Sequence, residues 1–108
     1  SGKGHAAMAV ALAAALSGRT THPGTVVLGT FDSDGVLMPA TGAGLGDLRA
    51  LEDVDEATRV VCQAAAALQL RSLMRTAASE FLRRRGLVVI GVESVEDVIR
   101  EALRPLHN

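Results

Sequence analysis

Two short aliphatic runs separated by a long helical pattern constrain the fold of this chain more than any other feature. Thr58–Cys62 and Leu87–Val92 are rich in β-branched residues and are typical of buried strands. Between them, residues from Ala64 to Arg85 repeat apolar side chains at helical spacing, and Gly86 marks the end of the pattern. Strands joined by such a crossover pair in parallel, because a tight hairpin cannot connect them. The pattern predicts an α/β layer with parallel pairing among the late strands.

The first half of the chain predicts a helix and then a hairpin. Ala6–Leu16 consists of good helix formers and is followed by Ser17 and Gly18, a common helix end. The helix is apolar nearly all round, so we expect it to be buried on most sides. Thr25–Phe31 and Val36–Met38 read as two strands joined by an Asp-Ser-Asp-Gly turn.

Two further helices complete the expected order. Asp47 is a plausible cap for a short helix that reaches about Ala57. Ser94 is expected to cap the last helix, with Asp97 three residues on as its capping-box partner. The order is helix, hairpin, helix, strand, helix, strand, helix, which predicts one α/β domain over residues 1–108 with a small mixed sheet. Abundant Ala and Gly favour close approach of helices to that sheet.

Composition excludes several classes of function. The formal net charge is −1 with mixed signs along the chain, so no field for nucleic acid or membrane is implied. The longest apolar stretch, Ala6–Leu16, is too short to span a bilayer. The single cysteine, Cys62, excludes an internal disulfide and fits a reducing compartment. We therefore expect a cytoplasmic protein with no targeting segment.

Three pieces of the sequence, in order, resemble the C-terminal proteolytic domain of the Lon protease family. The helix from Met8 to Gly18 is similar to the family's helix behind the catalytic serine. The segment Val26–Pro39 resembles its glycine-punctuated hairpin, which ends in proline, and Val92–Leu103 resembles its last strand and helix. The resemblance implies the family's α/β fold, also described as ribosomal-protein-S5-domain-2-like. It covers the later part of that proteolytic domain.

The same resemblance implies that the family's catalytic dyad is replaced. In the family a serine begins the first helix, and a lysine in the loop before the next helix acts as its base. Register from Gly18 places Lys3 at the serine position and Gly46 at the lysine position, and the chain has no second lysine. A Ser–Lys dyad needs a hydroxyl and a neutral amine within hydrogen-bond reach. We expect no catalytic residue of the family type here.

Three functions remain open at this point. The first is a Lon-like, non-proteolytic domain that serves assembly, scaffolding or substrate docking in an ATP-dependent complex, with an AAA+ module in the parent chain, a protein substrate and a homo-oligomer as partners. The second is a divergent Lon-type serine peptidase with a nucleophile outside this chain or in another register. The third is a regulatory module that binds an anion or nucleotide near Gly42–Gly46.

Other polar residues favour ordinary structural roles. Ser1–His5 contains Gly-Lys-Gly but lacks the spacing and hydroxyl of a phosphate-binding loop. The three histidines and Cys62 are not at metal-ligand spacing, so no metal or cofactor is expected. Asp32–Gly35 is turn chemistry and fits no calcium-loop spacing. The Arg83–Arg85 cluster suits a helix C-terminus, and nucleic-acid binding by this chain alone is not expected.

Overall fold

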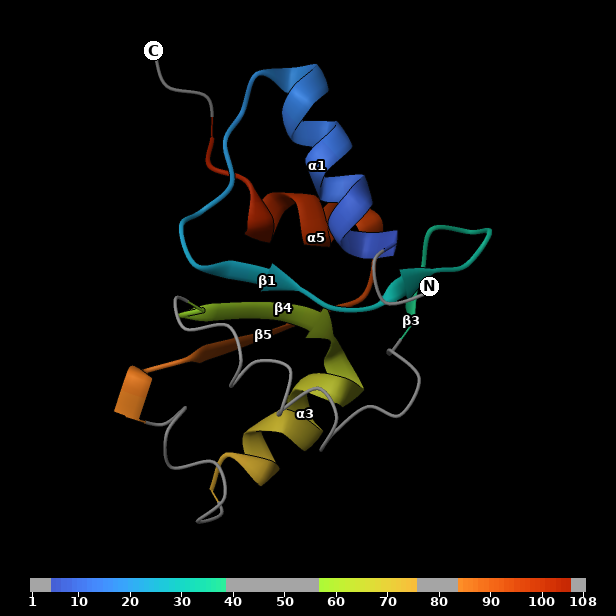
Figure 1. The fold of residues 1–108 in the computed structure, drawn as a ribbon. Helices are drawn as coiled ribbons and strands as arrows, with labels where there is room; N and C mark the ends of the chain where they lie inside the picture. Colours follow the sequence, from blue (N-terminus) through green and yellow to red (C-terminus); the bar gives the residue numbers. More distant parts are fainter. Residues whose placement is uncertain (1–4, 39–56, 76–83, 106–108) are drawn as a thin grey trace.

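The computed structural model describes residues 5–38, 57–75 and 84–105. These form three helices, a parallel three-stranded sheet and a two-stranded antiparallel sheet, arranged in layers (Figure 1). The elements of the first segment are α1 (His5–Ser17), β1 (Thr25–Val27), β2 (Thr30–Phe31) and β3 (Leu37–Met38). The remaining elements are β4 (Arg59–Gln63), α3 (Ala64–Leu73), β5 (Val88–Val92) and α5 (Val95–Ala102).

The central sheet has the strand order β1-β4-β5, and both of its strand pairs are parallel. Val26 lies opposite Val60, and Val60 lies opposite Val89. The parallel pairing expected for the two late strands is confirmed, and β1 joins the same sheet on the other side of β4. The single mixed sheet that the sequence predicts is instead divided into this parallel sheet and the separate β2–β3 hairpin.

The division occurs at Gly29, which interrupts the predicted strand Thr25–Phe31. Leu28 still donates its N–H to the carbonyl of Val61, at 3.0 Å, so it continues the edge of the parallel sheet. Gly29 has a φ of +126°, a conformation that side-chain-bearing residues rarely adopt. The chain turns there and enters the hairpin. Asp32 closes the hairpin turn, since its Oδ1 accepts from the N–H groups of Asp34 and Val36 at 2.9 and 3.0 Å.

Helices cover both faces of the parallel sheet, with α1 and α5 on one side and α3 on the other (Figure 1). Alternate residues of β4 serve the two cores, because neighbouring side chains of a strand point to opposite faces. Val60 and Cys62 pack in the cluster on the α3 side, whereas Val61 packs in the cluster with Val98 and Ala102 of α5. All five of these side chains are buried, so the sheet is a covered central layer.

Small residues allow α3 to lie close to the sheet, as the composition predicts. A Cβ placed on Gly91 of β5 would lie 3.0 Å from the Cα of Ala64 and 3.1 Å from the Cβ of Ala67. The helix begins directly after β4, and the Gln63 side chain accepts a hydrogen bond from the Ala66 N–H at 3.1 Å. The predicted helix extends to Arg85; α3 ends at Leu73, and residues 76–83 lie outside the described part.

The last helix forms as its sequence predicts. The Ser94 hydroxyl accepts from the Asp97 N–H at 3.2 Å and caps the helix, while Val98 and Ala102 are fully buried on its apolar side. The Arg100 guanidinium donates to Asp97 at 2.6 Å and holds the pKa of that carboxyl below its ordinary value. The helix predicted from Asp47 lies outside the described residues.

Candidate functional site

The two positions equivalent to the Lon dyad, Lys3 and Gly46, both lie outside the described residues. Ser1, the Gly42–Gly46 loop and His107 lie outside them as well. The structure therefore neither brings these residues together nor separates them. The dyad alignment stays a prediction, and the described residues must be examined for a site in their own right.

The remaining polar residues singled out by sequence are distributed over the structure. Cys62 is a buried thiol in β4, and His22 is half-buried in the segment before β1. Within residues 5–38, 57–75 and 84–105, no three or more His, Cys, Asp or Glu residues are placed to hold a metal ion. Arg84 is exposed, and Arg85 donates to the Ala57 carbonyl at 3.5 Å.

Helix α1 presents the most unusual surface of the described structure. Met8, Leu12 and Leu16 are 69%, 61% and 79% exposed. They follow at four-residue intervals and therefore lie one above the other on the same side of the helix. Ala11 and Ala15, which are small, are exposed beside them. We call these five residues the α1 stripe.

The α1 stripe corrects the prediction that this helix is buried on most sides. Among residues 8–17, only Val10 is buried, and Ala13 and Ala14 are half-buried against the same core cluster. The physical reason is geometric: a helix that lies on α5 and the sheet edge turns only one side toward them, and no other described element covers its far side (Figure 1). A uniformly apolar sequence therefore leaves large side chains in solvent. Such stripes mark interaction sites more often than isolated exposed leucines do.

No helix among the described residues is both long enough and apolar enough to cross a membrane.

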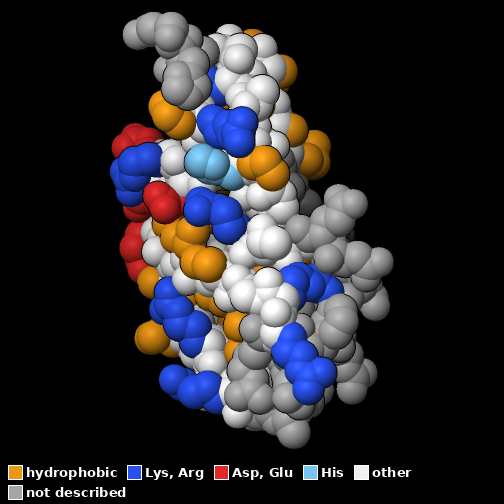
Figure 2. Space-filling model, turned by 90° about the vertical axis from the view of Figure 1, so that its left-hand side faces the viewer, with side chains coloured by type: hydrophobic (Ala, Val, Ile, Leu, Met, Phe, Trp, Pro, Cys, Tyr) orange, Lys and Arg blue, Asp and Glu red, His pale blue; other side chains and the backbone are white. Residues whose placement is uncertain are grey.

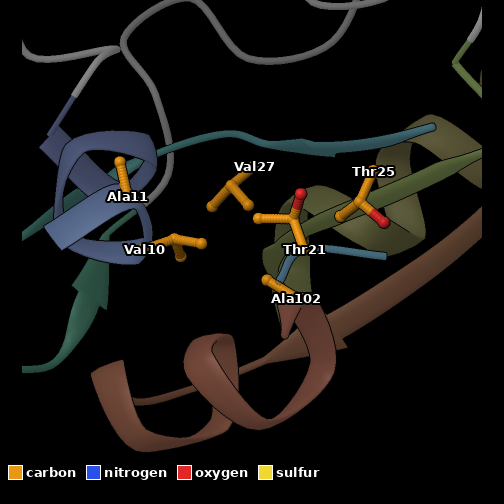
Figure 3. A pocket seen from close by; sticks show the side chains of 6 residues that line it. All are labelled: Val10, Ala11, Thr21, Thr25, Val27 and Ala102. Atoms are coloured by element: carbon orange, nitrogen blue, oxygen red, sulfur yellow. The ribbon is translucent and has the colours of Figure 1, made fainter. Parts of the chain in front are cut away.

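A small pocket lies beside the stripe, between α1, β1 and the end of α5. Its volume is about 140 Å³, and the residues that line it are Val10, Ala11, Thr21, Thr25, Val27 and Ala102. In Figure 3, Val10 and Val27 point toward one another across it, and the methyl groups of the threonines complete its wall. This lining contains no titratable side chain, so the pocket offers space for an apolar group and no acid–base chemistry.

Two buried polar atoms near this pocket lack a hydrogen-bond partner among the described residues. They are Oγ1 of Thr25 and Nε of Arg59, and these residues lie opposite one another in the β1–β4 register. The Arg59 guanidinium is held by another of its nitrogens, Nη2, which donates to the Glu101 carbonyl at 2.7 Å. The Thr25 hydroxyl points away from the other lining residues in Figure 3. The Thr25 hydroxyl therefore faces away from the pocket, and Arg59 is not among the lining residues.

Arginines dominate the face shown in Figure 2, whereas acidic side chains gather along one edge of it. Several arginines of the described residues join elements through backbone carbonyls. Arg19 donates through Nε to the Arg104 carbonyl at 2.9 Å, and Arg71 donates to the Val89 carbonyl. Arg19 and Arg59 both reach carbonyls at the C-terminal end of α5, where the helix dipole favours positive charge. These hydrogen bonds give Arg19, Arg59 and Arg71 a structural role.

Neither models of known protein families nor curated proteins match this chain.

Sequence reasoning missed both the α1 stripe and the pocket. The large residues Met8, Leu12 and Leu16 share one side of α1 while alanines occupy much of the other, but all of them are apolar, so this difference in size did not indicate which side is exposed. The pocket had no signal in the sequence either, since its lining comes from α1, β1, α5 and the segment before β1, and their packing cannot be read from spacing alone.

Proposed function

We propose that this chain is a Lon-like, non-proteolytic domain that serves docking and assembly within an ATP-dependent complex. The proposal rests on the order of elements combined with the replaced positions. The described part contains α1, β1, the β2–β3 hairpin, β4, α3, β5 and α5 in that order, and this order is compatible with the later part of a Lon-type domain. Within that order, Lys3 aligns with the serine and Gly46 with the lysine of the dyad, so the first position carries no hydroxyl nucleophile and the second carries no amine base.

The exposed stripe of α1 supports the assembly part of the proposal. A docking module requires an exposed apolar surface, and Met8, Leu12 and Leu16 provide one on α1. The pocket beside the stripe has room for one apolar group of a partner. Through both features the chain would bind a partner by packing of apolar side chains, which is the kind of contact that a scaffold domain makes.

A serine-directed covalent probe tests the non-proteolytic part. We expect no labelling of the chain under conditions that label an active Lon-type protease. A matched series of variants then tests the alignment from Gly18. The double variant Lys3→Ser/Gly46→Lys restores both the hydroxyl and the amine of the dyad, while each single variant restores one of them. We expect labelling only in the double variant, because the hydroxyl needs its base.

Two results would contradict the proposal. Labelling of the unsubstituted chain would support the divergent peptidase instead. An unlabelled but folded double variant, checked by circular dichroism, would show that the alignment from Gly18 is out of register.

A further inference from the structure

We infer that the α1 stripe pairs with the same stripe of a second copy of this chain, with the two helices antiparallel about a two-fold axis at Leu12. The inference rests on the assembly role proposed above and names the surface and the partner for it. It follows from the exposure of the stripe, its lack of charge and its distribution of large and small residues.

The charge of α1 selects the kind of partner. The helix spans 13 residues, His5–Ser17, with no acidic residue in its first turn and no basic residue in its last. None of its residues is Asp, Glu, Lys or Arg. A charged partner surface would lose hydration here without gaining an opposite charge. An uncharged apolar face complements it, and the chain's own α1 is such a face.

The absence of cations also argues against a membrane surface as the occupant. Helices that lie in the lipid interface are typically rich in Lys or Arg on the polar side of an amphipathic helix. The other side of α1 instead carries Val10, Ala13 and Ala14, which face the protein core. The helix is fixed at α5 and presents one narrow row of large side chains, a shape suited to another helix.

Shape determines the orientation. In the row Met8, Leu12 and Leu16, the central member is Leu12, so an antiparallel pair crossing there sets Met8 of one copy beside Leu16 of the other. Ala11 and Ala15 flank the row and allow the backbones to approach closely. The antiparallel arrangement also places opposite ends of the two helix dipoles together, whereas a parallel pair would place like ends together. A self-complementary patch of this kind is what a two-fold interface requires.

The first experiment measures the mass of the chain by sedimentation over a range of concentrations. We expect a concentration-dependent dimer of modest affinity, because three large side chains per copy make a small interface. Leu12→Glu places two like charges at the axis and should weaken dimerisation by roughly tenfold or more. The matched control is Leu68→Glu, an equally exposed leucine (65%) on α3, which should leave the dimer unchanged.

Cross-linking tests the orientation. Leu12→Cys should form a disulfide-linked dimer by itself on mild oxidation. Met8→Cys should not, but an equal mixture of Met8→Cys and Leu16→Cys chains should cross-link. Cys62 is buried, and the unsubstituted chain serves as the control for its reactivity.

The outcomes separate this inference from the proposed function. A wild-type chain that is monomeric at all concentrations, or a dimer that survives Leu12→Glu, overturns the pairing and leaves the non-proteolytic assignment in place. Self-cross-linking of Met8→Cys overturns the antiparallel arrangement. Labelling by a serine-directed probe overturns the proposed function, while the mass and cross-linking results still decide the pairing.

Discussion

At the scale of single residues, Gly29 has neither the backbone conformation nor the space that a side chain needs. Its φ of +126° lies in a region that favours glycine, and a Cβ there would lie 2.7 Å from the Met38 carbonyl oxygen and 3.0 Å from Leu37 Cδ1. The first of these contacts is with backbone, which cannot rotate aside. The residue therefore both breaks the strand and permits the hairpin to fold against it.

We predict that Gly29→Ala lowers the free energy of unfolding by about 3 kcal/mol or more, because backbone strain and overpacking act together. Gly18→Ala is the control. Gly18 also has a positive φ, +72°, but nothing lies within 4 Å of its added Cβ, so the cost should be only about 1 kcal/mol. Urea unfolding of both variants measures the difference. Equal losses of unfolding free energy in the two variants would show that the Cβ added at Gly29 does not clash with the Met38 carbonyl oxygen.

At the scale of elements, the structure divides α1 into a buried and an exposed side that the sequence does not separate. Local patterns predicted the late strands and the Ser94 cap, since β-branched runs and an N-terminal serine act over a few residues. Residues 6–16 are apolar throughout, so periodicity could not indicate which side of α1 faces α5. The strand break was missed because a β-branched pattern surrounds Gly29, although a glycine within a strand is itself a warning.

We predict that α1 responds to truncation on its buried side alone. Val10→Ala removes methyl groups from a side chain that is 4% exposed and should cost about 2 kcal/mol. Leu12→Ala removes more atoms but from the exposed side, and should change the free energy of unfolding by less than about 0.5 kcal/mol. Denaturant titration at low chain concentration keeps the monomer dominant. A large loss for Leu12→Ala under those conditions would mean that another part of the chain covers it.

At the scale of the whole molecule, the fold is a sheet between two helical layers. Parallel sheets are usually covered on both faces, and Val60 and Val61 of β4 show this directly, since they are consecutive, point to opposite cores and are both fully buried. The α/β class was predictable from strand and helix spacing. The pocket and the α1 stripe were not, because they depend on how distant segments pack. The dyad positions lie outside the described residues, so that part of the sequence interpretation remains a prediction.

We predict that Val60→Thr and Val61→Thr each lower the free energy of unfolding by about 1–3 kcal/mol, because each buries a hydroxyl without a partner. Val88→Thr is the control, since Val88 lies in the same sheet but is 52% exposed; its effect should stay within about 0.5 kcal/mol. Thermal unfolding of the three variants gives the comparison. Tolerance of either β4 variant would show that one face of the sheet is loosely covered.

The strand order β1-β4-β5 has a consequence for biosynthesis. Within the described sheet, β1 pairs only with β4, so the first strand leaves the ribosome well before its partner has been translated. Until then β1 lacks its partner in the described sheet. The parallel sheet of the described part is therefore completed late in synthesis, after β4 and β5 emerge.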